Sequence, residues 1–87
     1  MASYSVRIKT SAAKELEAVD PRSIRVRIVS RIQALARSPR PSGCQKLAGE
    51  AERYRLRQGS YRIVYAVDDE QRVVEVVKIG HRREVYR

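Results

Sequence analysis

The alternation of arginines with apolar residues around position 55 is the feature that most constrains the fold. It occupies six consecutive positions: Arg53, Tyr54, Arg55, Leu56, Arg57 and Gln58. Successive side chains of a β-strand point to opposite faces, so the pattern predicts a strand with one apolar and one cationic face. Gly59-Ser60 favours a tight turn, and the mostly apolar run from Tyr61 to Val67 predicts the partner strand of a hairpin. A polar turn at residues 68–71 and a strand at residues 72–79 complete a meander.

The first half of the chain predicts one strand and two helices. Residues 3–9 alternate in polarity like a half-buried strand. A first helix follows, which Thr10 or Ser11 can cap, and Asp20-Pro21 favours the start of a second helix. The second helix carries one apolar stripe, made of Ile24, Ile28, Ile32 and Leu35.

The predicted order of elements, β-α-α-β-β-β, contains too few helices for a doubly wound parallel sheet. We therefore expect an α+β fold in which both helices pack on one face of a mostly antiparallel, four-stranded sheet. The other face of the sheet is then partly open to solvent. At 87 residues, the chain is expected to form a single domain over residues 1–87.

The charge of the chain predicts a polyanionic partner. The formal net charge is +9, and 15 arginines accompany only four lysines. Arginine favours planar, bidentate contacts with phosphate or carboxylate, so RNA, DNA and an acidic protein all qualify. A single cysteine, Cys44, cannot form an internal disulfide, and no apolar leader or membrane-length run is present. A cytoplasmic protein that contacts no membrane is therefore expected.

Three positions stand out as candidates for chemistry. Arg62 is the one charge in an apolar strand, so it must be paired or must face the open side of the sheet. His81 is the only histidine, and it can act as a base or simply be exposed. Tyr86 can stack on a base, donate a hydrogen bond or transfer a proton. No metal-ligand spacing is present, so neither a metal nor a cofactor is expected.

Four motifs in order resemble the RelE branch of the RelE/ParE toxin superfamily of bacterial toxin–antitoxin pairs. They are Lys46-Leu47-Ala48-Gly49, Tyr54-Arg55-Leu56-Arg57, Gly59-Ser60-Tyr61-Arg62-Ile63-Val64-Tyr65 and Gly80-His81-Arg82-Arg83-Glu84-Val85-Tyr86. The resemblance covers nearly the whole chain and includes the β-α-α-β-β-β order. It implies a metal-independent endoribonuclease that enters the ribosomal A site, cleaves the bound mRNA and is held inactive by an antitoxin.

The resemblance also implies roles for individual residues. Arg62 would stabilise charge on the scissile phosphate, and Tyr86 would position the base and take part in proton transfer. The catalytic candidates are Arg55, Arg57, Arg62, Arg82 and Tyr86, with His81 and Arg83 as further possibilities, and the RNA-binding candidates are Arg53, Lys46 and Lys78. Arginine keeps its proton at any reachable pH, so proton transfer is left to Tyr86 or His81. The 2′-OH would attack the adjacent phosphate and leave a cyclic phosphate.

Two other functions fit the same sequence. A toxin of the ParE branch would bind DNA gyrase and cut no nucleic acid, but that branch does not generally keep the arginines and the terminal tyrosine together. A non-catalytic RNA-binding or ribosome-binding module would need only the charge. For either toxin, the expected partner is an antitoxin with an acidic, partly disordered segment that covers the arginines or displaces the C-terminal tail. The toxin–antitoxin complex is expected to be a higher oligomer.

Overall fold

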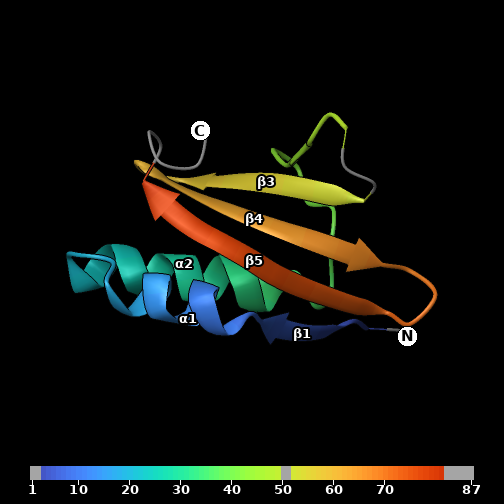
Figure 1. Cartoon of the computed structure of the whole chain (residues 1–87), viewed down its shortest axis with the longest axis horizontal. Helices are drawn as coiled ribbons and strands as arrows, with labels where there is room; N and C mark the ends of the chain where they lie inside the picture. The colour runs from blue at the N-terminus through green and yellow to red at the C-terminus, as the bar shows by residue number, and fades with distance from the viewer. Residues whose placement is uncertain (1–2, 50–51, 82–87) are drawn as a thin grey trace.

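A five-stranded sheet, in the order β1-β5-β4-β3-β2, organises the protein in a computed structural model that describes residues 3–49 and 52–81. The elements are β1 (Ser5–Ile8), α1 (Thr10–Glu17), α2 (Arg22–Ala34), β2 (Gln45–Lys46), β3 (Arg53–Gln58), β4 (Tyr61–Asp68) and β5 (Val73–His81). β1 pairs with β5 in parallel, and the other pairs are antiparallel. Both helices run along the same side of the sheet (Figure 1). The predicted α+β architecture is confirmed, with one strand more than expected.

The additional strand, β2, has only two residues and pairs with β3 through Gln45 and Lys46. A pattern with a period of two needs at least four residues to be recognised. A strand of two residues therefore gives no signal in the sequence. Its effect is to cover part of the edge of β3. The remainder of β3, toward Gln58, has no neighbour on that side among the described residues.

The core lies between the helices and the apolar face of the sheet. Its largest fully buried side chains come from β3, β4 and β5, from α2 and from the residues that flank α2. They are Tyr65, Ile28, Leu35, Leu56, Ile63, Ile79, Val19, Val74 and Val76. In β3 the alternation behaves as predicted, because Tyr54 and Leu56 are buried and Arg57 is exposed. Desolvation by burial raises the pKa of the Tyr65 phenol, whose O–H donates to the Pro39 carbonyl at 2.8 Å.

Both helices begin without the side-chain caps that the sequence predicts. α1 starts at Thr10 itself, preceded by Lys9, and no side chain caps it. The Lys9 N–H donates to the Val76 carbonyl at 2.9 Å, so the chain turns from the sheet directly into the helix. α2 starts at Arg22, one residue later than expected, because Pro21 is extended and its carbonyl accepts from the N–H of Ile24 at 3.0 Å. Pro21 therefore stands at the cap rather than inside the first turn.

A β-bulge in the β4–β5 ladder changes which side chains share a face. Val64 pairs with Lys78, whereas the next residue, Tyr65, pairs with Val76, which leaves Val77 as the extra residue. Before the bulge the even-numbered residues of β5 face the helices, and after it the odd-numbered residues do. Lys78 and Gly80 are thereby placed on the outer face of the sheet, while Ile79 points into the core.

Candidate functional site

Four arginines form what we call the arginine face, on the side of the sheet opposite the helices. They are Arg53, Arg55, Arg57 and Arg62. Arg57 and Arg62 are directly opposite each other in the β3–β4 ladder. Side chains paired in this way leave Cα atoms about 4.5–5.5 Å apart, and successive arginines along β3 are about 7 Å apart. The face therefore carries a row of arginines along β3. At one end of the row, Arg57 and Arg62 face each other across the ladder, and we call these two residues the crossed pair.

Arg62 occupies the most enclosed position on this face. It is only 2% exposed, and it is the one charged residue among the buried residues described. Its Nη1 donates to the Tyr61 carbonyl at 3.2 Å, and its opposite residue on β5 is Gly80, which has no side chain to compete for space. A buried guanidinium held by hydrogen bonds is fixed in orientation, which is what charge stabilisation at a defined point requires.

The other cationic candidates on β3 and β5 differ in their exposure and in their partners. Arg55 donates to the side-chain oxygen of Gln45 on β2, its ladder partner, and Arg57 is exposed. Lys78 lies beside the arginine face, opposite Val64 in the ladder, but its Nζ is 2.8 Å from a Glu15 carboxylate oxygen on α1. The predicted RNA contact by Lys78 would therefore compete with an existing ion pair.

Lys46 and His81 lie on the other side of the sheet. Lys46 pairs with the inward-facing Tyr54, and its Nζ is 4.0 Å from a Glu52 carboxylate oxygen. His81 pairs with Tyr61, and their rings are 5.7 Å apart in an edge-to-face arrangement. The structure thus brings Arg55, Arg57 and Arg62 together and separates His81 from them.

Three of the predicted site residues lie outside the described residues: Arg82, Arg83 and Tyr86. Their placement relative to the arginine face stays a prediction. Gly80 and His81, the last described residues, end β5 at the level of Arg62 and Tyr61.

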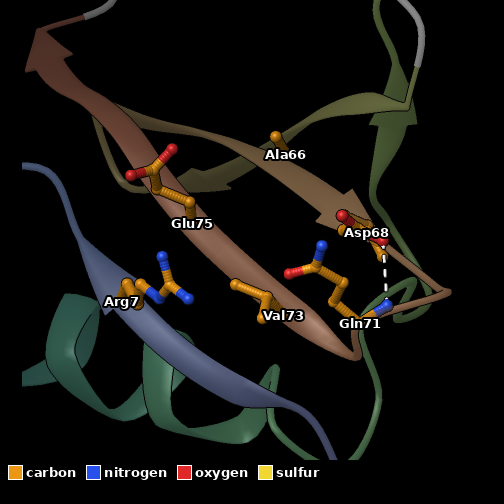
Figure 2. A pocket seen from close by; sticks show the side chains of 7 residues that line it. Arg7, Ala66, Asp68, Gln71, Val73 and Glu75 are labelled. Atoms are coloured by element: carbon orange, nitrogen blue, oxygen red, sulfur yellow. Dashed lines mark hydrogen bonds between the residues drawn. The ribbon is translucent and has the colours of Figure 1, made fainter.

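The opposite end of the outer face has a different chemistry. A hollow of about 270 Å³ lies there, lined by Arg7, Ala66, Val67, Asp68, Gln71, Val73 and Glu75 (Figure 2). Arg7 on β1 and Glu75 on β5 are ladder partners, so a carboxylate accompanies the cation. The acidic side chains make this end less favourable for an anion than the end that carries Arg57 and Arg62.

A polar cluster around Arg40, in the segment between α2 and β2, was not predicted from the sequence. Its guanidinium is bidentate to Asp69, at 2.8 and 3.1 Å, and also donates to Glu52 at 3.1 Å and to the Tyr54 hydroxyl at 2.8 Å. Tyr4, ahead of β1, donates to Asp69 at 2.6 Å. The only signal in the sequence is an arginine between two prolines. Arg40 joins the start of β3 to the β4–β5 turn and so helps to fix the strand that carries the arginines.

This cluster predicts a loss of stability in acid. The hydrogen bond from Arg40 holds the pKa of Asp69 below its ordinary value, and the one from Tyr4 adds to the effect. A carboxyl group whose pKa is lowered by folding stabilises the fold at pH values above its unfolded-state pKa, which is about 4. This contribution is lost as the pH falls through the lower, folded-state pKa. Below about pH 5, the thermal midpoint should fall more steeply in the natural protein than in Asp69→Asn.

The matched control for this prediction is the neighbouring carboxylate. Asp68 accepts from the Gln71 N–H at 3.0 Å, a bond that an asparagine oxygen can keep. Asp68→Asn should therefore retain the acid dependence of the natural protein in melts between pH 3 and 7. Equal slopes for the natural protein and Asp69→Asn would show that the Arg40 cluster is not linked to stability.

Residues 3–49 and 52–81 contain neither a candidate metal site nor a candidate membrane-spanning helix. No group of three or more His, Cys, Asp or Glu side chains within these ranges is arranged to hold a metal ion. No helix in the same part of the chain is both long enough and apolar enough to cross a membrane.

Comparison with known proteins decides the family. Residues 6–86 match the sequence profile of the family described as the ParE toxin of type II toxin–antitoxin systems, parDE. The chain belongs to this toxin family. Toxin RelG from Mycobacterium tuberculosis is 31% identical over 84 residues, which cover 97% of this toxin and 97% of RelG.

Solved structures similar to this toxin include proteins named RelE. In the toxin–antitoxin complex RelBE2 from Mycobacterium tuberculosis, the matching chain is 31% identical with a TM-score of 0.79, over 93% of this toxin and 100% of that chain. The isolated E. coli RelE toxin is 33% identical with a TM-score of 0.76, over 95% of this toxin and 90% of that chain. These similarities confirm the predicted membership in the RelE branch of the RelE/ParE superfamily.

Proposed function

We propose that this toxin is a metal-independent endoribonuclease that cleaves mRNA in the ribosomal A site and so inhibits translation. The observation that carries the proposal is the crossed pair of Arg57 and Arg62, opposite each other in the β3–β4 ladder on the outer face. Two arginines directly opposite each other can direct their guanidiniums to separate oxygens of one phosphodiester. Similarity to proteins named RelE supports the same activity.

The proposed reaction is an internal displacement within the RNA. The ribose 2′-oxygen loses its proton to a base and bonds to the adjacent phosphorus, and the bond from phosphorus to the 5′-oxygen breaks. An acid then protonates the departing 5′-oxygen, leaving a 2′,3′-cyclic phosphate and a 5′-hydroxyl. Arg62 would stabilise the negative charge on the five-coordinate phosphate, while Arg55 and Arg57 would hold the strand. Tyr86 remains the proposed group for proton transfer.

The described residues near Arg62 include no suitable group for proton transfer, which is why we propose that the ribosome takes part. Beside Arg62, the described part of the outer face holds Val64, Gly80 and Lys78, and the Lys78 ammonium is paired with Glu15. None of these is suited to take a proton from a hydroxyl at neutral pH. Ribosomal RNA would then orient the message and assist proton transfer, which places the proposed activity in the cytoplasm and makes the free toxin nearly inert.

An antitoxin is the proposed protein partner. Solved relatives include RelBE2 from Mycobacterium tuberculosis, a toxin–antitoxin complex, and an archaeal RelE–RelB complex from Pyrococcus horikoshii. Between positions 21 and 49 this toxin has no acidic residue and seven basic ones: Arg22, Arg25, Arg27, Arg31, Arg37, Arg40 and Lys46. Val26 on α2 is 52% exposed among these charges. An acidic segment with apolar side chains would complement the arginines of α2 around Val26.

The second candidate function is inhibition of DNA gyrase without cleavage. It is favoured by the description of the matching family, a ParE toxin. A gyrase inhibitor does not need two arginines crossed over one phosphate, so the arginine face favours the nuclease. The two functions differ in their product, because a gyrase inhibitor damages DNA and leaves mRNA intact.

Removal of a single 2′-hydroxyl tests the proposed reaction. Ribosomes are programmed with a message in which the nucleotide on the 5′ side of the cut is 2′-deoxy, and the toxin is added. Cleavage at that bond should be abolished, because the attacking oxygen is gone, and gel analysis of the labelled message measures it. A message with the deoxy substitution three nucleotides away serves as the control and should be cut normally. Equal cleavage at the deoxy position would rule out the internal displacement.

A further inference from the structure

A hollow on the helix side of the sheet, at the same end as the crossed arginines, has no role in the proposed reaction. Its volume is about 190 Å³, and it is lined by Glu15, Ala18, Tyr61, Ile79, Gly80 and His81. Glu15 and Ala18 come from α1 and its end, and the other four come from the ends of β4 and β5. The hollow and the arginine face are thus two sides of the same strand ends.

Two aromatic rings form one wall of this hollow. Tyr61 and His81 meet edge to face, with ring centroids 5.7 Å apart. Tyr61 is half-buried against the core, and His81 is exposed. An edge-to-face pair uses the face of only one ring, so aromatic surface remains for a third planar group.

The carboxylate of Glu15 forms the polar side of the hollow. One oxygen accepts the Ile79 N–H at 2.9 Å, and the other accepts from Lys78 Nζ at 2.8 Å. These two bonds fix the carboxylate, and each oxygen keeps a further lone pair for a donor. The hollow therefore combines ring faces with a fixed hydrogen-bond acceptor, which is the chemistry of a nucleobase site.

We propose that this hollow binds one nucleobase of the RNA strand, stacked on Tyr61 and His81, with an exocyclic amino group donating to Glu15. Guanine, adenine and cytosine carry such a group. Uracil presents an N–H flanked by two carbonyl oxygens, which Glu15 repels. The proposal rests on the proposed function for the identity of the strand. Tyr61 and Arg62 are neighbours at the start of β4 but face opposite sides of the sheet, so the RNA would pass around these strand ends between the arginine face and the hollow.

The single histidine of the chain makes a direct test possible, because its ring-proton signals are unambiguous in a proton NMR spectrum. The full chain is titrated with guanosine 5′-monophosphate, uridine 5′-monophosphate and ribose 5-phosphate. We expect the guanine nucleotide to move the His81 signals upfield to saturation, and uridine monophosphate to bind more weakly. Ribose 5-phosphate, which has the sugar and phosphate but no base, should leave these signals in place.

Two variants identify the side chains responsible. Tyr61→Leu keeps an apolar side chain but removes the ring, and it should weaken guanosine monophosphate binding about tenfold, the loss expected for one stacking contact. Glu15→Gln should reduce the preference for guanosine over uridine monophosphate. Amide spectra establish that each variant is folded. If Tyr61→Leu does not fold, binding by His81→Ala is followed instead through the guanine H8 signal, and the same loss is expected.

Several outcomes would overturn the proposal. Equal shifts with ribose 5-phosphate and the nucleotides would mean that His81 senses only the phosphate, and unchanged affinity in a folded Tyr61→Leu or His81→Ala would exclude stacking. This test is independent of catalysis. If the toxin leaves mRNA intact but binds guanosine monophosphate in this hollow, the nuclease proposal fails and the base site stands. If the toxin cleaves mRNA but binds no nucleotide in the hollow, the base site fails and the nuclease proposal stands.

Discussion

Arg62→Met lowers the rate of mRNA cleavage about 10²–10³-fold, the effect of removing one preorganised group that stabilises transition-state charge. Arg62 is 2% exposed and lies opposite Arg57 and Gly80. Methionine keeps an unbranched stem of similar length in this enclosed space, so packing is largely retained while the charge and the donors are lost. Cleavage of message on programmed ribosomes under single-turnover conditions measures the change.

Two companion variants separate chemistry from folding. Arg62→Ala should be as inactive as Arg62→Met, and it should abolish toxicity in cells. Arg62→Lys keeps the charge but loses the planar fork, so it should recover only part of the rate. Thermal melts are run on all three. Wild-type cleavage by a folded Arg62→Met would remove Arg62 from the mechanism, and with it the role of the crossed pair.

Leu56→Ala destabilises the protein by about 2–5 kcal/mol, the range for truncating a fully buried leucine. Leu56 is 1% exposed and belongs to the core between the helices and the sheet. Small domains are stable by only about 5–15 kcal/mol, and an 87-residue chain belongs toward the lower end. A substantial unfolded fraction is therefore expected near body temperature. Urea unfolding followed by circular dichroism measures the loss.

The matched control is the adjacent residue on the same strand. Arg57 is exposed on the outer face, so Arg57→Ala should change stability by no more than about 0.5 kcal/mol. It should nevertheless reduce cleavage, because it removes one of the two crossed guanidiniums. A stability loss at Arg57 as large as that at Leu56 would contradict the division of β3 into a core face and an arginine face.

Local patterns in the sequence were sufficient for most of the fold. The alternation in β3 and the apolar run in β4 predicted the hairpin and the turn at Gly59-Ser60, which the structure confirms. These signals are readable because a half-buried strand must present one kind of side chain to the core. The face that carries Arg53, Arg55 and Arg57 follows from the same alternation.

Features that depend on pairing between distant segments were not accessible in this way. The bulge at Val77 reverses the faces of β5, so a strict period of two would misplace Lys78 and His81. The Arg40 cluster joins segments that are far apart in the chain, with Asp69 29 positions away. Neither leaves a local pattern, because each arises only when the sheet has formed.

The separation of His81 from the arginines has a direct consequence for the mechanism. The sequence left proton transfer to Tyr86 or His81, but His81 contacts Tyr61 and lines the hollow beside α1. A base must lie within hydrogen-bonding reach of the proton that it removes. We therefore assign His81 to base binding in our proposal and leave proton transfer to Tyr86 with the ribosome.

Mapping of message ends in a translating extract tests the central claim most directly. Extracts are incubated with the toxin or with Arg62→Met, and the new 5′ ends are aligned to the reading frame. The nuclease proposal predicts ends that recur in phase with the ribosomal A site, that disappear when translation is blocked before initiation, and that Arg62→Met does not produce. Intact messages together with gyrase-dependent DNA breaks, or cuts that do not follow the reading frame, would contradict it.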